Sequence, residues 1–183
     1  LFDIPRELAY LNTAYFGCFS KKTTETAVES AKIKSQPWNI TIPDFFKDAE
    51  KARNLFASII NTETDNIALI PSASYGFAIA AKNIELSSSD TILLLSEQFP
   101  SNYYVWEEQS KLTGARLSIV PRPEDDDWTN SVINHIDSDK SIKLISLENN
   151  HWTDGGLLDL PQISNHIKGK NIKLLVDGTQ SVG

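Results

Sequence analysis

Apolar residues follow two different spacings along the chain, and the change comes near residue 67. Before that point, one set recurs every three or four positions and therefore shares a helical face, namely Phe45, Ala49, Ala52, Phe56 and Ile59. This spacing predicts a helix over 45–59, and a further helix is predicted over 24–35. Thr41, with Asp44 three positions later, is a start signal for the first of these helices.

From residue 67 onward, short runs of Ile, Leu and Val alternate with helical stretches. Such continuous runs are typical of strands covered on both faces, and here they predict strands over 67–70, 91–95, 117–120, 144–147 and 172–176. Helices are predicted between them over 75–84, 102–113, 129–136 and 160–167. The alternation predicts a three-layer α/β fold, in which helices cover both faces of a mostly parallel sheet.

The spacing also indicates how the chain is organised. We expect an N-terminal arm with the first helix over 1–45, followed by a large domain over 46–183 that is incomplete at its C-terminus. The chain contains no Met, even at position 1, and we interpret it as a piece of a longer reading frame. The arm over 1–22 is apolar without a helical or strand period, which favours its burial across an interface or over the site of its own subunit, although packing on its own domain is the alternative.

Composition narrows the class of protein. The 183 residues are 40% hydrophobic and 22% charged, which are globular proportions. The 17 basic and 24 acidic residues give a net charge of −7, which argues against nucleic-acid and anionic membrane partners. The single Cys18 excludes an internal disulfide and a Cys-rich metal site, so we expect no metal and a reduced, cytoplasmic setting.

Candidate chemistry follows the predicted strands, because ligands of open parallel sheets bind beyond the carboxyl ends of the strands. Ser72 precedes a predicted helix whose N-terminus suits a phosphate, although an ordinary helix cap has the same pattern. Phe99 could lie flat on a ring or belong to the core. Asp177 could bind a protonated ring nitrogen or cap a turn, and Gln180 could reach a ring hydroxyl or face solvent.

His151 and Trp152 also follow a predicted strand, and two interpretations of them remain open. They line the same pocket, or they pack locally. Taken together, the strand ends describe a site for a phosphorylated, aromatic, nitrogen-containing ring.

At this point the segment VDGTQSVG at 176–183 resembles the signature of class V aminotransferases, which are pyridoxal 5′-phosphate (PLP) enzymes of fold type I. Four further segments resemble family segments in the same order: LNTAYFG at 11–17, PSASYGFAIAA at 71–81, SEQFPSNYYVW at 96–106 and HWTDGGLLDL at 151–160. The resemblance therefore extends over essentially the whole chain.

The resemblance implies roles around the cofactor ring. Asp177 would keep the pyridine nitrogen protonated, and Gln180 would donate to the phenolic oxygen of the ring. Phe99 would stack on the ring, where many class V enzymes have His. The Phe99 context and the HWTDGG segment differ from the standard cysteine desulfurases.

The resemblance also implies contacts to the phosphate and the substrate. Ser74, with backbone N–H groups near Ala73, would hold the phosphate, and Thr153 would be a further cofactor contact. Asn12 would lie near the substrate carboxylate. The Schiff-base lysine of the family would lie beyond Gly183, and no family position for that role matches the lysines present at 143, 168, 170 and 173.

The implied protein is a PLP-dependent, class V aminotransferase-like enzyme that acts on an amino acid through an aldimine. Its chemistry would be that of a transaminase, an epimerase or a lyase, including cysteine desulfurase-like reactions, in a homodimer. The 183 residues alone would be inactive. The alternative is a non-catalytic or truncated paralogue that acts as a binding or regulatory protein. A dinucleotide-binding domain would need a Gly-rich first turn, which the sequence lacks.

Overall fold

The computed structural model describes residues 1–182. The chain divides into two compact units, Leu1–Leu69 and Ile70–Gly183, and each is described by itself below. No helix within the described residues is long and apolar enough to cross a membrane.

The first unit is built from helices. They are α1 (Lys21–Ile33), η1 (Pro37–Asn39), α2 (Asp44–Ile59) and η2 (Thr64–Asn66). Helix α1 begins three residues before the predicted start, because the Ser20 hydroxyl accepts a hydrogen bond from the backbone N–H of Thr23 at 3.1 Å. At the start of α2, the carboxylate of Asp44 accepts from the N–H and the hydroxyl of Thr41 at 2.8 and 2.6 Å. The predicted Thr41–Asp44 pair is therefore present at the start of α2, although the N-cap residue is Pro43 and no side chain caps the helix.

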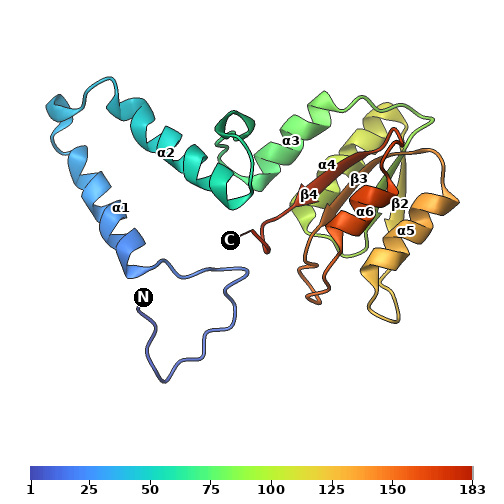
Figure 1. The fold of residues 1–183 in the computed structure, drawn as a ribbon, viewed down its shortest axis with the longest axis horizontal. Coiled ribbons are helices and arrows are strands. Elements are labelled where there is room, and N and C mark those ends of the chain that lie inside the picture. Colours follow the sequence, from blue (N-terminus) through green and yellow to red (C-terminus); the bar gives the residue numbers. More distant parts are fainter. Residues whose placement is uncertain (183) are drawn as a thin grey trace. The chain divides into compact units, whose positions relative to one another are not determined.

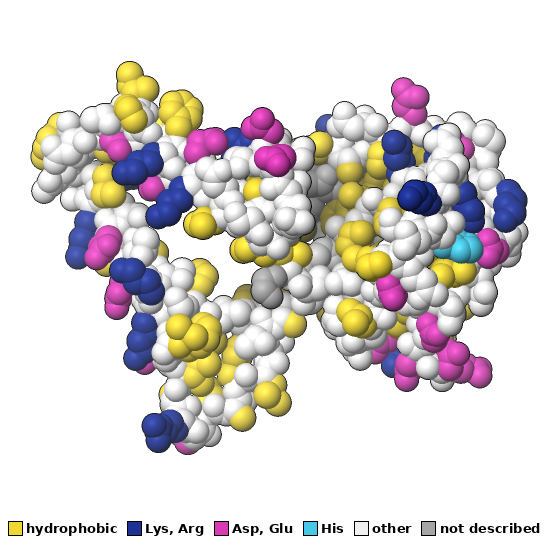
Figure 2. Space-filling view, viewed as in Figure 1, with side chains coloured by type: hydrophobic (Ala, Val, Ile, Leu, Met, Phe, Trp, Pro, Cys, Tyr) yellow, Lys and Arg dark blue, Asp and Glu magenta, His cyan; other side chains and the backbone are white. Residues whose placement is uncertain are grey.

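The apolar face of α2 is present but is not covered within its own unit. Figure 2 shows apolar side chains on the surface of the first unit. Phe45, Phe56 and Ile59 of this face are all exposed. Ala57 is the one buried residue of α2, and α1 buries none. Amphipathic spacing thus produces the helix, while the apolar side of the helix remains largely exposed.

The second unit is a three-layer α/β domain (Figure 1). Along the chain it contains α3 (Ala73–Asn83), β1 (Thr91–Leu95), α4 (Pro100–Thr113), β2 (Arg116–Val120), α5 (Trp128–Ser138), β3 (Ile142–Glu148), α6 (Leu160–His166) and β4 (Lys173–Asp177). The strands lie in the order β2-β1-β3-β4, and all three pairings are parallel. The predicted fold class is confirmed.

Strand residues alternate between two cores, as a period of two requires. Leu93, Ile145 and Leu147 face α5 and α6, where they pack with residues such as Trp128. Ile92, Leu94 and Leu144 face α3 and α4, together with Phe77 and Trp106. Burial of each such side chain contributes about 1.5–3 kcal/mol, so the central strands β1 and β3 anchor the unit.

The strand predicted over 67–70 is wrong. In the structure this segment is extended but belongs to no sheet, and Leu69 and Ile70 are 56% and 42% exposed. The carbonyl of Ile67 accepts from the guanidinium Nε of Arg53 at 2.8 Å instead of a neighbouring strand. An apolar run forms a strand only when another strand pairs with its backbone, and none of the four described strands does so here.

Candidate functional site

The carboxyl ends of the strands meet at one edge of the sheet, since all of them are parallel. Two carboxylates stand side by side there, because Glu148 and Asp177 are register partners at the ends of β3 and β4. Glu148 is 0% exposed and Asp177 is 8% exposed. The N–H and the hydroxyl of Thr179 donate to Oδ1 of Asp177 at 3.0 and 2.5 Å, and no described residue donates to Oδ2.

A cavity of about 230 Å³ lies beside Asp177. Its walls are formed by α3 and by the end of β4, through Ala73, Gly76, Phe77, Leu175, Val176 and Asp177. The cavity therefore brings together two residues that the sequence predicted as cofactor contacts, Ala73 and Asp177.

The helix N-terminus at this cavity has free backbone donors. The Ser72 hydroxyl caps α3 by accepting from the N–H of Tyr75 at 3.2 Å. Within the described residues, the N–H groups of Ala73 and Ser74 donate to no other group, because they precede the first i→i−4 bond of the helix. Together with the helix dipole, these two donors suit an anion.

Phe99 lies between β1 and α4, where it is the N-cap residue of α4. Its backbone N–H donates to Oε1 of Glu148 at 2.5 Å. Its ring packs edge to face against Trp152, with centroids 5.3 Å apart and planes at 80°. The indole N–H of Trp152 in turn donates to the carbonyl of Glu97 at 2.7 Å.

His151 is packed against its neighbours in the structure. It is 1% exposed and stacks on Trp128 with a centroid distance of 4.6 Å. Its Nε2 donates to the carbonyl of Ser96 at 2.9 Å, and its Nδ1 lies 3.0 Å from the hydroxyl of Thr153. Thr153, a predicted cofactor contact, is thus hydrogen-bonded to a buried histidine.

Two acids near this edge respond to their surroundings in opposite ways. Burial raises the pKa of Glu148 and nearby Asp177 adds to the rise, whereas the N–H groups of Phe99 and Trp152 and nearby His151 oppose it. Burial also acts to raise the pKa of Asp154, but hydrogen bonds from Gly156 and Trp128, with His151 and Arg122 nearby, bring it below its ordinary value.

Ser74, Phe99, Thr153 and Gln180 are not among the residues that line this cavity. Gln180 is half-buried in the turn that follows β4. Asn12 lies in the first unit, where its carbonyl accepts from the N–H groups of Tyr15 and Phe16. Conversely, sequence reasoning gave no role to Glu148, although a carboxylate at the end of an otherwise apolar strand was a signal for one.

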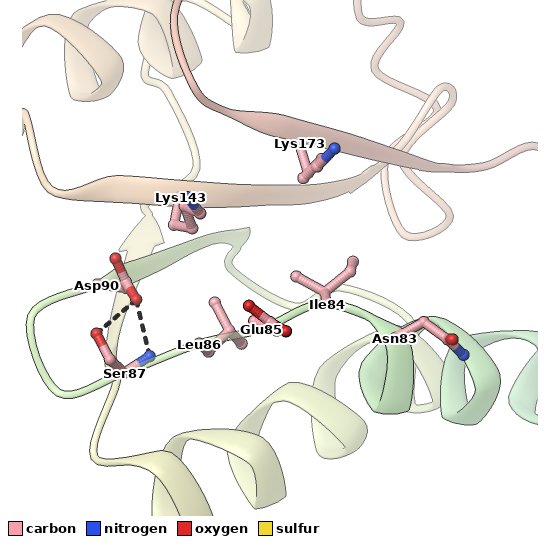
Figure 3. Close-up of a pocket in the computed structure, with 8 residues that line it drawn as sticks. All are labelled: Asn83, Ile84, Glu85, Leu86, Ser87, Asp90, Lys143 and Lys173. Carbon is pink, nitrogen blue, oxygen red and sulfur yellow. Dashed lines mark hydrogen bonds between the residues drawn. The ribbon is translucent and has the colours of Figure 1, made fainter.

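A second cavity, of about 570 Å³, lies at the opposite end of the strands (Figure 3). Lys143 and Lys173 project into it from the starts of β3 and β4, across from the loop that holds Asp90. Oδ2 of Asp90 accepts from the N–H and the hydroxyl of Ser87, both at 2.7 Å. Both lysines therefore lie at the end of the sheet opposite to Asp177. No cluster of metal-ligating side chains occurs in residues 1–182.

Open parallel α/β sheets bind ligands beyond the carboxyl ends of their strands, and helix N-termini suit anions. The chain belongs to the aminotransferase class-V family, whose sequence model matches residues 41–183.

Individual relatives agree with this placement. The chain is 28% identical over 155 residues to the uncharacterized aminotransferase YcbU of Bacillus subtilis, covering 85% of this chain and 40% of YcbU. It is 25% identical over 137 residues to a probable cysteine desulfurase of Mycoplasma genitalium, covering 73% of this chain and 33% of that protein.

A solved structure shows the same fold. A mutant of C-DES with glycine covalently linked to its PLP cofactor superposes with a TM-score of 0.79 at 19% identity, covering 96% of this chain and 48% of that one. The chain thus spans less than half the length of each of these three proteins.

Proposed function

We propose that this protein is a PLP-dependent enzyme of the class V type that acts on an amino acid, and that its second unit supplies the phosphate and ring-nitrogen contacts. The observation that carries the proposal is the cavity shared by the start of α3 and Asp177. Among the described residues, one end offers N–H donors without an acceptor and the other a carboxylate oxygen without a donor. A phosphorylated pyridine ring requires both.

The residues present fit the cofactor in their chemistry as well as their placement. The N–H groups of Ala73 and Ser74, with the Ser74 hydroxyl, would hold the phosphate. Asp177 would accept a hydrogen bond from the protonated ring nitrogen through Oδ2, while the hydrogen bonds from Thr179 to Oδ1 keep the carboxylate oriented. A bound PLP supplies an electron sink for the carbon next to the substrate amine, provided that its ring nitrogen stays protonated.

Other residues complete the proposed site. The Phe99 ring would cover one side of the cofactor ring, exclude water and strengthen the charge interaction at Asp177. Gln180 and Thr153 would add polar contacts to the cofactor, and Asn12 would approach the substrate carboxylate. The parent enzyme would be a homodimer with two-fold symmetry.

Substitutions at the two ends of the cavity test the proposal. The purified protein is titrated with PLP and binding is followed by absorbance and equilibrium dialysis. Ser74→Asp places a carboxylate at the phosphate end and should reduce affinity at least about 100-fold, since like charges repel strongly in a water-poor site. Asp177→Asn should retain part of the affinity through the phosphate contacts, but should lose the absorbance band of the protonated ring.

The matched control is Ser89→Asp, in an exposed turn before β1. It introduces the same charge and should leave PLP affinity unchanged. If Ser74→Asp binds PLP as tightly as Ser89→Asp, the cavity is not the phosphate site. In the complete enzyme, Asp177→Asn should lower turnover of an amino acid by at least about 10²-fold, the scale of removing one group that stabilises developing charge.

A further inference from the structure

Glu148 places a carboxyl group at a buried position, where a charged group is energetically unfavourable. It ends β3 with 0% exposure, where most strand residues are Ile or Leu. Burial of a carboxylate costs free energy unless hydrogen bonds compensate it, and a second carboxylate, Asp177, is its register partner. An apolar residue would fill the same place without this cost. The hydrogen bonds of Glu148 therefore indicate what the carboxylate does.

Both oxygens of Glu148 hold backbone N–H groups of other segments. Oε1 accepts from Phe99, at the start of α4, at 2.5 Å. Oε2 accepts from Trp152, in the loop after β3, at 2.9 Å. One side chain thus joins the backbones that carry the two rings of the edge-to-face pair. A neutral amide cannot replace it, because its NH₂ group would face one of the two N–H donors.

The loop that receives this contact needs support. It runs from Ser96 to Phe99, and Glu97 within it has a positive φ of 55°, which is uncommon for a residue with a side chain. Two further hydrogen bonds come from the same segment after β3, from His151 to the carbonyl of Ser96 and from Trp152 to the carbonyl of Glu97. Glu148 makes the only one of these three bonds that reaches Phe99 itself.

We infer that Glu148 is a positioning residue of the proposed cofactor site, which fixes the backbone of Phe99 so that its ring stacks on PLP. The inference rests on the proposed function, because it assigns Phe99 to that ring. Glu148 itself contacts neither phosphate nor ring nitrogen in this assignment. It acts through the backbone of Phe99 and, by way of Trp152, through the ring packed against it.

The experiment compares wild type with Glu148→Gln, Phe99→Leu and the double variant. Glu97→Gln is the control, because it removes the same charge from an exposed side chain of the same loop. Amide hydrogen exchange over 96–103 is measured without PLP. Affinity for PLP and the induced circular dichroism of the saturated complex are measured with it.

We expect exchange over 96–103 to be about tenfold faster in Glu148→Gln, the scale of losing one hydrogen bond to a charged group. PLP affinity should fall about tenfold, and the induced dichroism of the saturated complex should change. In the Phe99→Leu background, Glu148→Gln should have little further effect on affinity, because residues that act through one another are not additive. Glu97→Gln should match wild type in each measurement.

The measurements distinguish failure of the inference from failure of the proposed function. Unchanged exchange in Glu148→Gln would overturn the inference. Faster exchange with additive effects of Glu148→Gln and Phe99→Leu on affinity would also overturn it, because Glu148 would then stabilise the fold without positioning Phe99. If wild type binds no PLP, the proposed function itself fails and the inference falls with it. If PLP binds and depends on Asp177 but not on Glu148, the proposed function stands without the inference.

Discussion

Replacement of His151 tests the packing that supports the candidate site. His151→Ala removes a ring that is 1% exposed and stacked on Trp128. It also removes the donor to the carbonyl of Ser96 and the partner of the Thr153 hydroxyl. The protein contains two other histidines, and Nε2 of the partly exposed His166 lies 2.9 Å from Oδ1 of Asp137, so the chain offers a matched control.

The expected cost follows from these contacts. Removal of a buried aromatic ring to Ala costs about 3–5 kcal/mol when the site collapses incompletely. The stacking contact accounts for about 0.5–1.5 kcal/mol of that cost, and an unpaired carbonyl at Ser96 for about 1–3 kcal/mol. We therefore expect His151→Ala to lower the free energy of unfolding by about 3–5 kcal/mol, and His166→Ala by no more than about 1 kcal/mol.

A third variant separates the two causes. His151→Phe keeps the volume and the stacking on Trp128 but loses both hydrogen bonds, so it should cost about 1–3 kcal/mol. Urea denaturation is followed by tryptophan fluorescence and far-ultraviolet circular dichroism. A loss for His151→Ala within about 0.5 kcal/mol of that for His166→Ala would refute the reasoning, since surface changes have effects of that size.

Three further predictions concern the same unit. Gly156→Ala should cost about 1–3 kcal/mol in thermal denaturation, since the new methyl would lie 2.4 Å from Cδ1 of the buried Trp128, whereas Gly169→Ser, where no atom lies within 4 Å, meets only the strain of its positive φ. Ser72→Ala should cost about 1 kcal/mol and weaken PLP binding slightly, because it removes the cap of α3, and an unchanged melting temperature would contradict this. Because burial raises the pKa of Glu148, the folded state is favoured when this carboxyl group is protonated. This contribution to stability is fully present below the pKa of Glu148 in the unfolded state and is lost as pH rises through its pKa in the folded state. The free energy of unfolding of wild type relative to Glu148→Gln, measured by urea titration, should therefore fall as pH rises from the ordinary glutamate pKa upward, and a flat difference would refute it.

The sequence alone predicted the layers of the second unit. The runs over 91–95, 117–120 and 144–147 each lie in a strand of the parallel sheet, and the run over 172–176 matches β4 to within one residue. The helices between them begin and end within two residues of the prediction. These elements are predictable because a strand covered on both faces must be apolar at consecutive positions, whatever its neighbours are. Asp177 could likewise be placed at the end of a strand from its position in the chain, whereas Ala73 begins α3 after a segment that is not a strand.

The tertiary structure decided what depends on partners distant in the sequence. The run over 67–70 is apolar like the true strands but pairs with none of them. The order of residues within a run does not show whether another strand pairs with it. The sequence left the surroundings of His151 open, and the structure shows this residue in contact with Trp128 and Ser96. The role of Glu148 depends on Phe99, 49 positions away, and no local pattern encodes that distance. Local propensity and the tendency to be buried follow from the residues of each segment, whereas hydrogen-bond partners are determined only when the strands assemble.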